Sequence, residues 1–322
     1  MKVLFVASNP ANESELGVDA EITALQAIFA NVHGQPIQFI VQPQAIIENL
    51  PIVIQRHKPD VLHITAHGSG EQLSMRNGAG DARKVTAELL GGFLADHRPT
   101  VIYLNACNSL DIARGLVEKT DVAIGSSEPI TNRAASAGAL NFYTAIVGGK
   151  SVGAAFRTAK TSVAAMQDRP VLEMKSADNV RADKIVLHEL PELIAVLTQK
   201  DLGRERSRWN VRFGLRGCPE NTVQVVFFTD DDEMIRDRDD PSKDLCQVHR
   251  RLPVNGIAWS DAAAVWPLED DMRMFAVGVT ASSHTFSVGS TVCVALEKGL
   301  AGLSHDRQAL SKPIIERLRK AT

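Results

Sequence analysis

The first half of the chain alternates short apolar, β-branched runs with amphipathic stretches of helical length. Such alternation is typical of βαβ units, which build a mostly parallel sheet with helices on both faces. We therefore expect an α/β fold in this half. Strands are expected at residues 2–7, 37–41, 60–65, 100–105 and 121–125, and helices at residues 19–31, 44–57, 85–96, 109–118, 132–147 and 151–166.

Residues 100–105 form a nearly uninterrupted apolar run, as expected of a central strand that is buried on both faces. A polar, glycine-rich segment at residues 68–81 follows the strand expected at residues 60–65, and residues 72–75 within it predict one arm of a hairpin. Loops at the carboxyl ends of parallel strands are where open α/β sheets place their functional sites. This edge of the sheet is therefore the expected location of a site.

After residue 167 the alternation of strands and helices gives way to shorter segments. Residues 171–175 and 184–188 are expected to pair as two strands, and residues 191–199 are expected to form a short helix. The charged stretch at residues 200–208 is typical of a linker between domains. We therefore assign residues 1–199 to a first domain.

Residues 209–322 show alternating strand patterns separated by turns, with little helical periodicity before the end. This pattern predicts a smaller, β-rich and sandwich-like C-terminal domain. Its expected strands are residues 210–215, 222–228, 272–279 and 292–296, with one helix at residues 311–320. The acidic stretch at residues 230–240 is an ordinary surface loop or, if it is mobile, a self-cleavage site.

The composition is that of an ordinary soluble protein, with 44% hydrophobic residues, 23% charged residues and a formal net charge of −3. This charge gives no reason to bind a polyanion, so nucleic acid is not an expected partner. The first apolar run is too short for a signal peptide, and no run approaches the ~18 apolar residues of a membrane span. We therefore expect a cytoplasmic protein without a membrane partner.

The four cysteines, Cys107, Cys218, Cys246 and Cys293, include no Cys-x-x-Cys pair. In a reducing compartment they are expected to be free thiols. Cys246 and His249 could begin a zinc site, but the other two C-terminal cysteines are single and distant, and packed thiols are the simpler interpretation. No metal and no other cofactor is therefore expected.

Two short segments each place a reactive side chain just past the end of an expected central strand. His67 follows the strand at residues 60–65, and Cys107 follows the strand at residues 100–105. If these strands are neighbours in a parallel sheet, their carboxyl ends bring together a thiol nucleophile and an imidazole that exchanges protons at neutral pH. The N–H groups of Gly68 and Cys107 are then candidates for an oxyanion hole. On spacing alone, a packed thiol and a turn histidine explain the same residues.

The ordered pair, a strand followed by His-Gly and a strand followed by Ala-Cys-x-Ser, resembles the CHAT branch of the caspase-like (clan CD) peptidases, relatives of separases and caspases. The matching residues are His63, His67, Gly68, Asn105, Ala106, Cys107 and Ser109. The similarity continues at residues 122–125, 134–135, 141–143 and 149–156, and the opening, residues 3–10 with Leu16 and Glu21, is similar to the start of stand-alone bacterial members. It covers roughly residues 1–190. His63, inside its strand, is expected to be structural.

The resemblance implies a caspase-like fold and a cysteine endopeptidase in which Cys107 attacks a peptide carbonyl and His67 protonates the leaving amine. The implied partner is a protein or peptide substrate. Family members usually act in bacterial signalling or defence, anti-phage defence included, and are switched on by a partner or an accessory domain. Residues 209–322, in which no family is recognised, are the expected sensor, docking, substrate-recruiting or oligomerising module.

The resemblance also implies a set of substrate-binding residues, which are Asn105, Ser126, Glu128 and Asn132. In the family, the loop after the strand at residues 121–125 helps to line the pocket for the residue before the scissile bond. Many members have an acidic residue near position 132, where this chain has Asn132. Glu128 is nearby, and a carboxylate that faces the pocket would favour Arg or Lys in the substrate. A solvated loop carboxylate would have no such effect.

Two other function classes fit parts of the sequence. The N-terminal domain could be a catalytically inactive caspase-like scaffold that serves as an interaction module, although the intact His67 and Cys107 argue against it. A flavodoxin-like nucleotide-binding domain would explain the βα alternation. It would need a glycine-rich phosphate-binding turn after the first strand, and residues 8–11 (Ser-Asn-Pro-Ala) contain no glycine.

Overall fold

The computed structural model describes residues 1–30 and 37–190, and beyond them the backbone of the strands between residues 192 and 291. Its contacts divide the chain after His188 into two units. The unit that ends at His188 carries a mostly parallel sheet, and in the unit that begins at Glu189 the described strands pair antiparallel. The candidate site lies in the first unit, so the fold of that unit decides its geometry.

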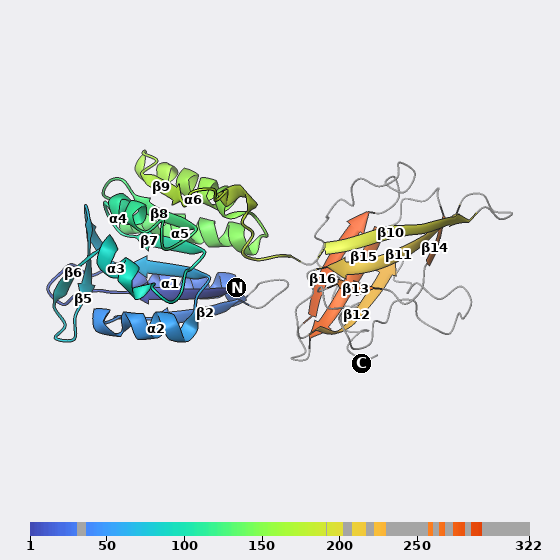
Figure 1. The fold of residues 1–322 in the computed structure, drawn as a ribbon. Helices are drawn as coiled ribbons and strands as arrows, with labels where there is room; N and C mark the ends of the chain where they lie inside the picture. Colours follow the sequence, from blue (N-terminus) through green and yellow to red (C-terminus); the bar gives the residue numbers. More distant parts are fainter. Residues whose placement is uncertain are drawn as a thin grey trace. The chain divides into compact units, whose positions relative to one another are not determined.

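The first unit is built on a six-stranded sheet (Figure 1). In spatial order the strands are β2 (Gln38–Gln42), β1 (Lys2–Ala7), β3 (Val61–Thr65), β7 (Val101–Asn105), β8 (Val122–Ser126) and β9 (Leu172–Ser176). The first five run parallel, and β9 pairs antiparallel with β8. The predicted α/β fold with a mostly parallel sheet is confirmed, and β7 lies inside the sheet, as its apolar sequence indicated.

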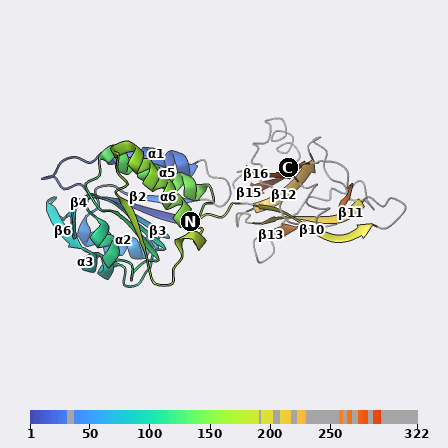
Figure 2. The ribbon, with the colours of Figure 1, turned by 90° about the horizontal axis from the view of Figure 1, so that it is seen from above.

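Helices cover both faces of this sheet, as Figure 2 shows. One face packs against α1 (Val18–Ala30), α5 (Asn132–Val147) and α6 (Val152–Gln167). The other face packs against α2 (Leu50–His57), α3 (Ala87–Phe93) and α4 (Leu110–Gly115). Successive residues of a strand point to opposite faces, so Tyr103 of β7 lies in the first core and Ile102 in the second.

Capping residues explain where several helices begin. Thr86, Thr131 and Ser151 precede α3, α5 and α6, and each side-chain oxygen accepts a hydrogen bond from the N–H three residues later. These bonds satisfy donors that the first helical turn leaves free. The helix predicted from residue 44 begins only at Leu50, after Gln44 with its left-handed φ of 55° and the 3₁₀ turn η1 (Ile47–Asn49).

A small antiparallel sheet follows β3 and consists of β4 (His67–Ser69), β5 (Gln72–Arg76) and β6 (Ala82–Thr86). Its middle strand contains the hairpin arm predicted at residues 72–75, which is confirmed. The helix predicted from residue 85 begins only at Ala87, because β6 continues to Thr86 and this threonine caps the helix. His67 is the first residue of β4, so this hairpin holds it directly after β3.

Two predictions between residues 184 and 199 were wrong. Residues 185–188 form no strand, and β9 pairs with β8 instead. Residues 192–199, predicted as a helix, belong to β10 (Glu192–Asp201), which pairs antiparallel with β11 (Arg208–Arg216). The apolar run in this segment suits a strand as well as a helix, and pairing with β11 decides between them. Of the linker predicted at residues 200–208, Lys200 and Asp201 belong to β10, and Arg208 begins β11.

The described part of the second unit contains two sheets. One consists of β10, β11, β13 (Ile257–Trp259) and β14 (Ala264–Pro267), and the other of β12 (Thr222–Thr229), β15 (Arg273–Thr280) and β16 (Thr285–Thr291). The strands predicted at residues 210–215, 222–228 and 272–279 overlap β11, β12 and β15. The sandwich-like packing of this unit stays a prediction.

Several predictions fall on residues outside the described part of the chain. They are the acidic loop at residues 230–240, the strand at residues 292–296, the helix at residues 311–320, and the statements on Cys218, Cys246, His249 and Cys293. Among the residues that are described, no helix is long and apolar enough to cross a membrane.

Candidate active site

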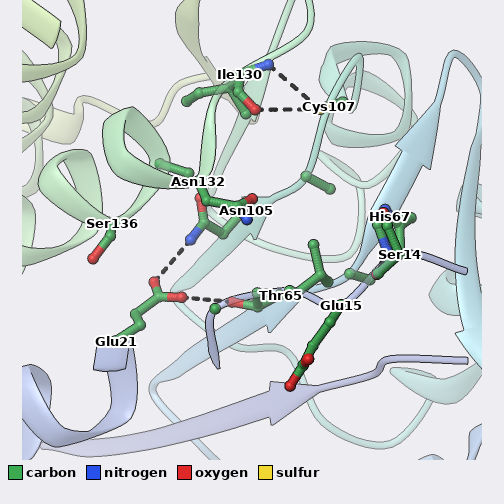
Figure 3. A pocket seen from close by; sticks show the side chains of 15 residues that line it. Ser14, Glu15, Glu21, Thr65, His67, Asn105, Cys107, Ile130, Asn132 and Ser136 are labelled. Atoms are coloured by element: carbon green, nitrogen blue, oxygen red, sulfur yellow. Dashed lines mark hydrogen bonds between the residues drawn. The ribbon is translucent and has the colours of Figure 1, made fainter. Parts of the chain in front are cut away.

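The carboxyl ends of β3 and β7 meet at one edge of the sheet, where the register pairs Thr65 with Asn105. His67 and Cys107 each follow two residues beyond this pair, so the two loops leave the sheet at the same level. Both side chains line a cavity of about 240 Å³ (Figure 3). The structure therefore brings together the imidazole and the thiol that lie far apart in the sequence.

Four parts of the chain line this cavity. They are the segment from Ser14 to Gly17 with Glu21 of α1, the end of β3, the end of β7, and the first turn of α5 with Ile130 before it. Of the four residues predicted to bind substrate, Asn105 and Asn132 line the cavity. No sequence pattern indicates Ser14, Glu15 or Ile130, because these residues come from loops whose approach depends on tertiary packing.

Cys107 lies in the turn between β7 and α4 and is partly exposed. Asn108, directly after it, has a left-handed φ of 48°, a conformation that Asn adopts more readily than most residues. The Cys107 Sγ donates to the carbonyl oxygen of Ile130 at 3.5 Å and accepts from the Ile130 N–H at 3.4 Å. Figure 3 shows the thiol turned toward Ile130. The loop before α5 thus holds the sulfur in this structure.

Ser109 fixes the turn that carries Cys107. Its fully buried hydroxyl donates to the carbonyl oxygen of Ala106 at 2.8 Å and accepts from the N–H of Ser126 at 3.0 Å. The turn is therefore tied both to its own start and to the neighbouring strand β8.

The other two candidate substrate-binding residues lie away from the cavity. Ser126 is buried, and its hydroxyl donates to the carbonyl oxygen of Glu128 at 2.6 Å. The Glu128 carboxylate is about half exposed and pairs with Arg169 at 2.8 Å. Neither residue is among those that line the cavity. Ser126 has a structural contact, and Glu128 forms a solvated ion pair.

Gly68 packs against the backbone of the Cys107 turn. A Cβ at position 68 would overlap the carbonyl oxygen of Cys107 and would lie 3.2 Å from the Cβ of Ala106. Only glycine permits this approach, because every other residue carries the Cβ. The close approach brings β4 and the turn of Cys107 together at the edge of the cavity.

His67 is oriented by the loop that follows β1. Its Nε2 lies 2.7 Å from the carbonyl oxygen of Ser14, and both side chains are labelled together in Figure 3. Because a carbonyl oxygen only accepts hydrogen bonds, Nε2 carries a hydrogen and donates it to Ser14. In the neutral ring this leaves Nδ1 as the nitrogen with a free lone pair.

A buried carboxylate, that of Glu21, belongs to a residue that lines the cavity. Only 3% of Glu21 is exposed. Its Oε1 accepts from Nδ2 of Asn105 at 2.8 Å, and its Oε2 accepts from the hydroxyl of Thr65 at 3.3 Å, the two bonds drawn in Figure 3. Among the described residues its ion-pair contact is with Nε2 of His63, at 3.4 Å. Glu21 is thus held by neutral donors and one histidine.

His63 links this carboxylate to the core, in agreement with the structural role predicted for it. The fully buried ring stacks between Phe5 and Tyr103, with ring centroids 4.7 and 4.9 Å away. Its Nδ1 lies 3.2 Å from the hydroxyl of Tyr143, and its Nε2 lies 3.2 Å from that of Thr65. A neutral ring with the hydrogen on Nε2 satisfies both contacts if Tyr143 donates to Nδ1.

The two tyrosines of the chain both lie in this cluster. Burial raises the pKa of the Tyr143 phenol well above its ordinary value of 10.0, and the neighbouring Tyr103 and Glu21 raise it further. Burial raises the pKa of Tyr103 in the same way, with Glu21 adding to the effect. Both phenols are therefore neutral at physiological pH, so Tyr143 keeps the proton that it donates to His63.

Metal ligands are not clustered in the part of the chain that the structure describes. No group of three or more His, Cys, Asp or Glu residues is arranged to hold a metal ion there. The residues that line the described cavity include a cysteine, a histidine and two glutamates.

Comparison with known proteins identifies the family of this region. The family model described as the CHAT domain matches residues 4–191. The chain is 24% identical over 173 residues to a Roc-COR-CHAT protease from an unknown prokaryotic organism, a match that covers 50% of this chain and 16% of that protein. It is 25% identical over 202 residues to a probable protease from Gillisia limnaea, a match that covers 60% of this chain and 34% of that protein.

The matched region is thus about a third or less of either curated relative. Among solved structures, the chain resembles an inactive zymogen of a C11 protease from Parabacteroides distasonis, with 14% identity, a TM-score of 0.34, and coverage of 56% of this chain and 62% of that chain. Since the family model spans more than half of the 322 residues, the chain belongs to the CHAT domain family.

Proposed function

We propose that this chain is a cysteine endopeptidase in which Cys107 is the nucleophile and His67 exchanges its proton. The observation that carries the proposal is the shared cavity: Cys107 and His67 follow adjacent parallel strands at the same level and line one cavity. The names of the curated relatives, both described as proteases, support the same reaction class.

The reaction begins with transfer of the thiol proton to Nδ1 of His67, the nitrogen that the bond from Nε2 to Ser14 leaves free. For this step the Cys107 side chain rotates away from Ile130, whose backbone holds it through weak bonds of 3.4 and 3.5 Å. The thiolate then attacks the peptide carbonyl carbon, and the carbonyl oxygen becomes an oxyanion. Imidazolium returns the proton to the leaving amine, and water hydrolyses the remaining thioester.

The N–H groups of Gly68 and Cys107 are the proposed donors to the oxyanion. Support comes from the close approach of the two backbones, since the Cα of Gly68 lies against the carbonyl group of Cys107. Backbone donors held in this way stabilise charge that develops in the transition state, and losing one such donor costs roughly 10²–10³-fold in rate.

The cavity is the proposed pocket for the substrate side chain before the scissile bond. Asn105 and Asn132 supply polar groups to it, and Ile130 supplies an apolar wall. The acidic residues among those that line it are Glu15 and Glu21. Buried charges in proteins are usually paired, and Glu21 has no lysine or arginine partner among the described residues. A Lys or Arg side chain of the substrate would provide that pairing.

The first test is intact-mass analysis after treatment with a peptide acyloxymethyl ketone that has Arg at its last position. Wild type is expected to gain one adduct, Cys107→Ala none, and His67→Ala only a slow one. A matched reagent with Leu at the last position tests the pocket separately from the reactivity of the thiol. Slower labelling by the Leu reagent than by the Arg reagent supports a preference of the pocket for a basic side chain. Replacing Glu21 by Gln is expected to reduce the preference for Arg.

The same experiment distinguishes the competing function class. A chain whose four thiols all react slowly and equally with the ketone is not an assembled peptidase by itself. Under that outcome the first unit is a catalytically inactive caspase-like scaffold, or an enzyme that needs an activator. The experiment is repeated with cell extract added as a source of activating partners. If wild type and His67→Ala are then still labelled equally, the inactive scaffold is the better description.

Regulation by residues 209–322 or by a partner, in bacterial signalling or defence within the cytoplasm, is part of the proposal. Its support is that both curated relatives carry the matched region within much longer chains. A difference in ketone labelling of the full chain with and without its bound partner would be the direct sign of such regulation.

A further inference from the structure

We propose that Glu13 is a positioning residue for the peptidase reaction proposed above, one that holds His67 and favours its protonated form. The Oε2 atom of Glu13 lies 3.8 Å from Nε2 of His67. Its Oε1 atom accepts a 2.6 Å hydrogen bond from the hydroxyl of Ser74. Neither the sequence pattern nor the relatives' names assign a role to this residue.

The environment of the Glu13 Oε2 atom points to such a role. This atom is buried, and among the described residues it has no hydrogen-bond partner. A buried acceptor without a partner is costly, so such atoms in native proteins call for an explanation. Among the described residues, the cation nearest to it is the imidazolium of His67, which forms only while the thiol proton resides on the ring and which attracts the carboxylate by charge, since Nε2–H donates to Ser14 in both states.

The placement of Glu13 is built by the hairpin that carries His67. The register pairs His67 directly with Ser74, so both residues project from the same face of this small sheet. The Ser74 hydroxyl therefore holds one carboxylate oxygen while the other faces the ring. Further bonds dock the loop of Glu13 on the hairpin: Ala11 N–H donates to the carbonyl oxygen of Gly80, and Ala82 N–H donates to Oδ1 of Asn12.

Glu13 and Ser14 both contact the Nε2 side of the His67 ring, and each has a different effect on it. The carbonyl oxygen of Ser14 fixes which nitrogen carries the hydrogen, and the Glu13 carboxylate adds a negative charge on that same Nε2 side. Glu13 does not line the cavity, whereas Cys107 does. Because this charge lies 3.8 Å from the ring and off the cavity wall, it is expected to favour the imidazolium more than it disfavours the Cys107 thiolate.

Among the described residues, the other titratable groups on the cavity wall are Glu15, Glu21 and the Cys107 thiol. Of the described carboxylates, Glu13 is the one within 4.0 Å of His67. Since His67 and Glu13 are each about one quarter exposed, solvent weakens the effect but does not remove it.

The test is the pH profile of Cys107 alkylation by iodoacetamide in the full chain, which reports thiolate and does not require peptide hydrolysis. Removing the charge in Glu13→Gln is expected to slow alkylation near pH 7 by up to about tenfold, because the thiolate–imidazolium pair loses the charge that stabilises the imidazolium. At alkaline pH, where the thiol ionises without the imidazolium, the rates of wild type and Glu13→Gln are expected to converge. Glu13→Asp keeps the charge and is expected to restore part of the rate near pH 7. Ser74→Ala releases the carboxylate from its anchor and is expected to give a smaller loss of rate.

The matched control is Glu71→Gln, which removes one exposed carboxylate from the turn of the same hairpin and is expected to leave the profile in place. A Glu13→Gln profile that superimposes on that of wild type would overturn the proposal. So would an equal loss of rate near pH 7 in Glu71→Gln, because net charge would then explain the effect. Should the ketone fail to label Cys107 while the alkylation profile still depends on Glu13 and His67, the peptidase proposal fails and the role of Glu13 stands.

Discussion

A methyl group at position 68 would meet backbone atoms, because a Cβ there overlaps the carbonyl oxygen of Cys107. A flexible side chain could rotate away from such a contact, whereas a peptide group in a fixed turn cannot. The turn is held by Ser109, so in Gly68→Ala the strand β4 must retreat instead. Restoring van der Waals contact requires a displacement of about 1 Å, and His67 moves with β4.

The expected effect of Gly68→Ala has two parts, a loss of folding free energy and a loss of reaction rate. Overpacking of this kind costs about 1–3 kcal/mol of folding free energy. A displacement of about 1 Å between reacting groups costs on the order of 10²-fold in rate. We therefore expect Gly68→Ala to remain folded at room temperature and to react with the peptide ketone about two orders of magnitude more slowly than wild type.

The assay compares the ketone labelling rate and the thermal unfolding of wild type, Gly68→Ala and Gly78→Ala. Gly78 lies in the loop between β5 and β6, and a Cβ there would meet nothing within 4 Å, so this variant controls for an added methyl group on the same hairpin. Labelling of Gly68→Ala at the wild-type rate would show that the approach of β4 to the Cys107 turn does not set the reactivity of the thiol.

Tyr143→Phe is expected to destabilise the chain by about 1–3 kcal/mol, because it leaves Nδ1 of His63 buried without a donor, whereas Tyr103→Phe, which removes a buried hydroxyl without a partner, is expected to be neutral or stabilising in thermal unfolding. Burial raises the pKa of both tyrosines above 10.0, so the folded chain keeps two protons that the unfolded chain releases; stability then falls as the pH rises above about 10, and tyrosinate absorbance is expected to appear together with unfolding and not before it. Ser109→Ala leaves the buried N–H of Ser126 without its acceptor and is expected to cost about 1–3 kcal/mol in unfolding experiments, while labelling of the thiol slows; unchanged stability would mean that water replaces the hydroxyl.

The central strands of the first unit could be predicted because a strand that is buried on both faces needs a short continuous apolar run, which is easily recognised in a sequence. The bounds of β1 and α5 agree with the prediction residue for residue. The strand β6 was missed because its side chains are mostly exposed and include Arg83 and Lys84, so no apolar run marks it. The strand β10 was taken for a helix because its apolar residues are consecutive and fit either period.

Of the candidate site, the pair of Cys107 and His67 could be predicted because both residues come directly after apolar runs that mark strands. That these two strands are neighbours was a condition of the prediction, and the pairing of β3 with β7 meets it. Glu21 was noticed only as part of a resemblance. It continues the buried stripe of α1 formed by Val18, Leu25 and Phe29, and a carboxylate in such a stripe is a signal that sequence can provide. The roles of Glu13, Ser14 and Ile130 depend on how loops dock, and no local pattern encodes that.

The stack of His63 on Tyr103 has a consequence for how this family can vary in length. His67 follows the stacked ring of His63 in β3 by four residues, and Cys107 follows the stacked ring of Tyr103 in β7 by the same interval. An insertion of one residue in either interval would turn the following side chains to the other face and break the level at which the two loops leave the sheet. Homologues should therefore conserve these two intervals jointly, and gain or lose residues in places such as the turn between β5 and β6.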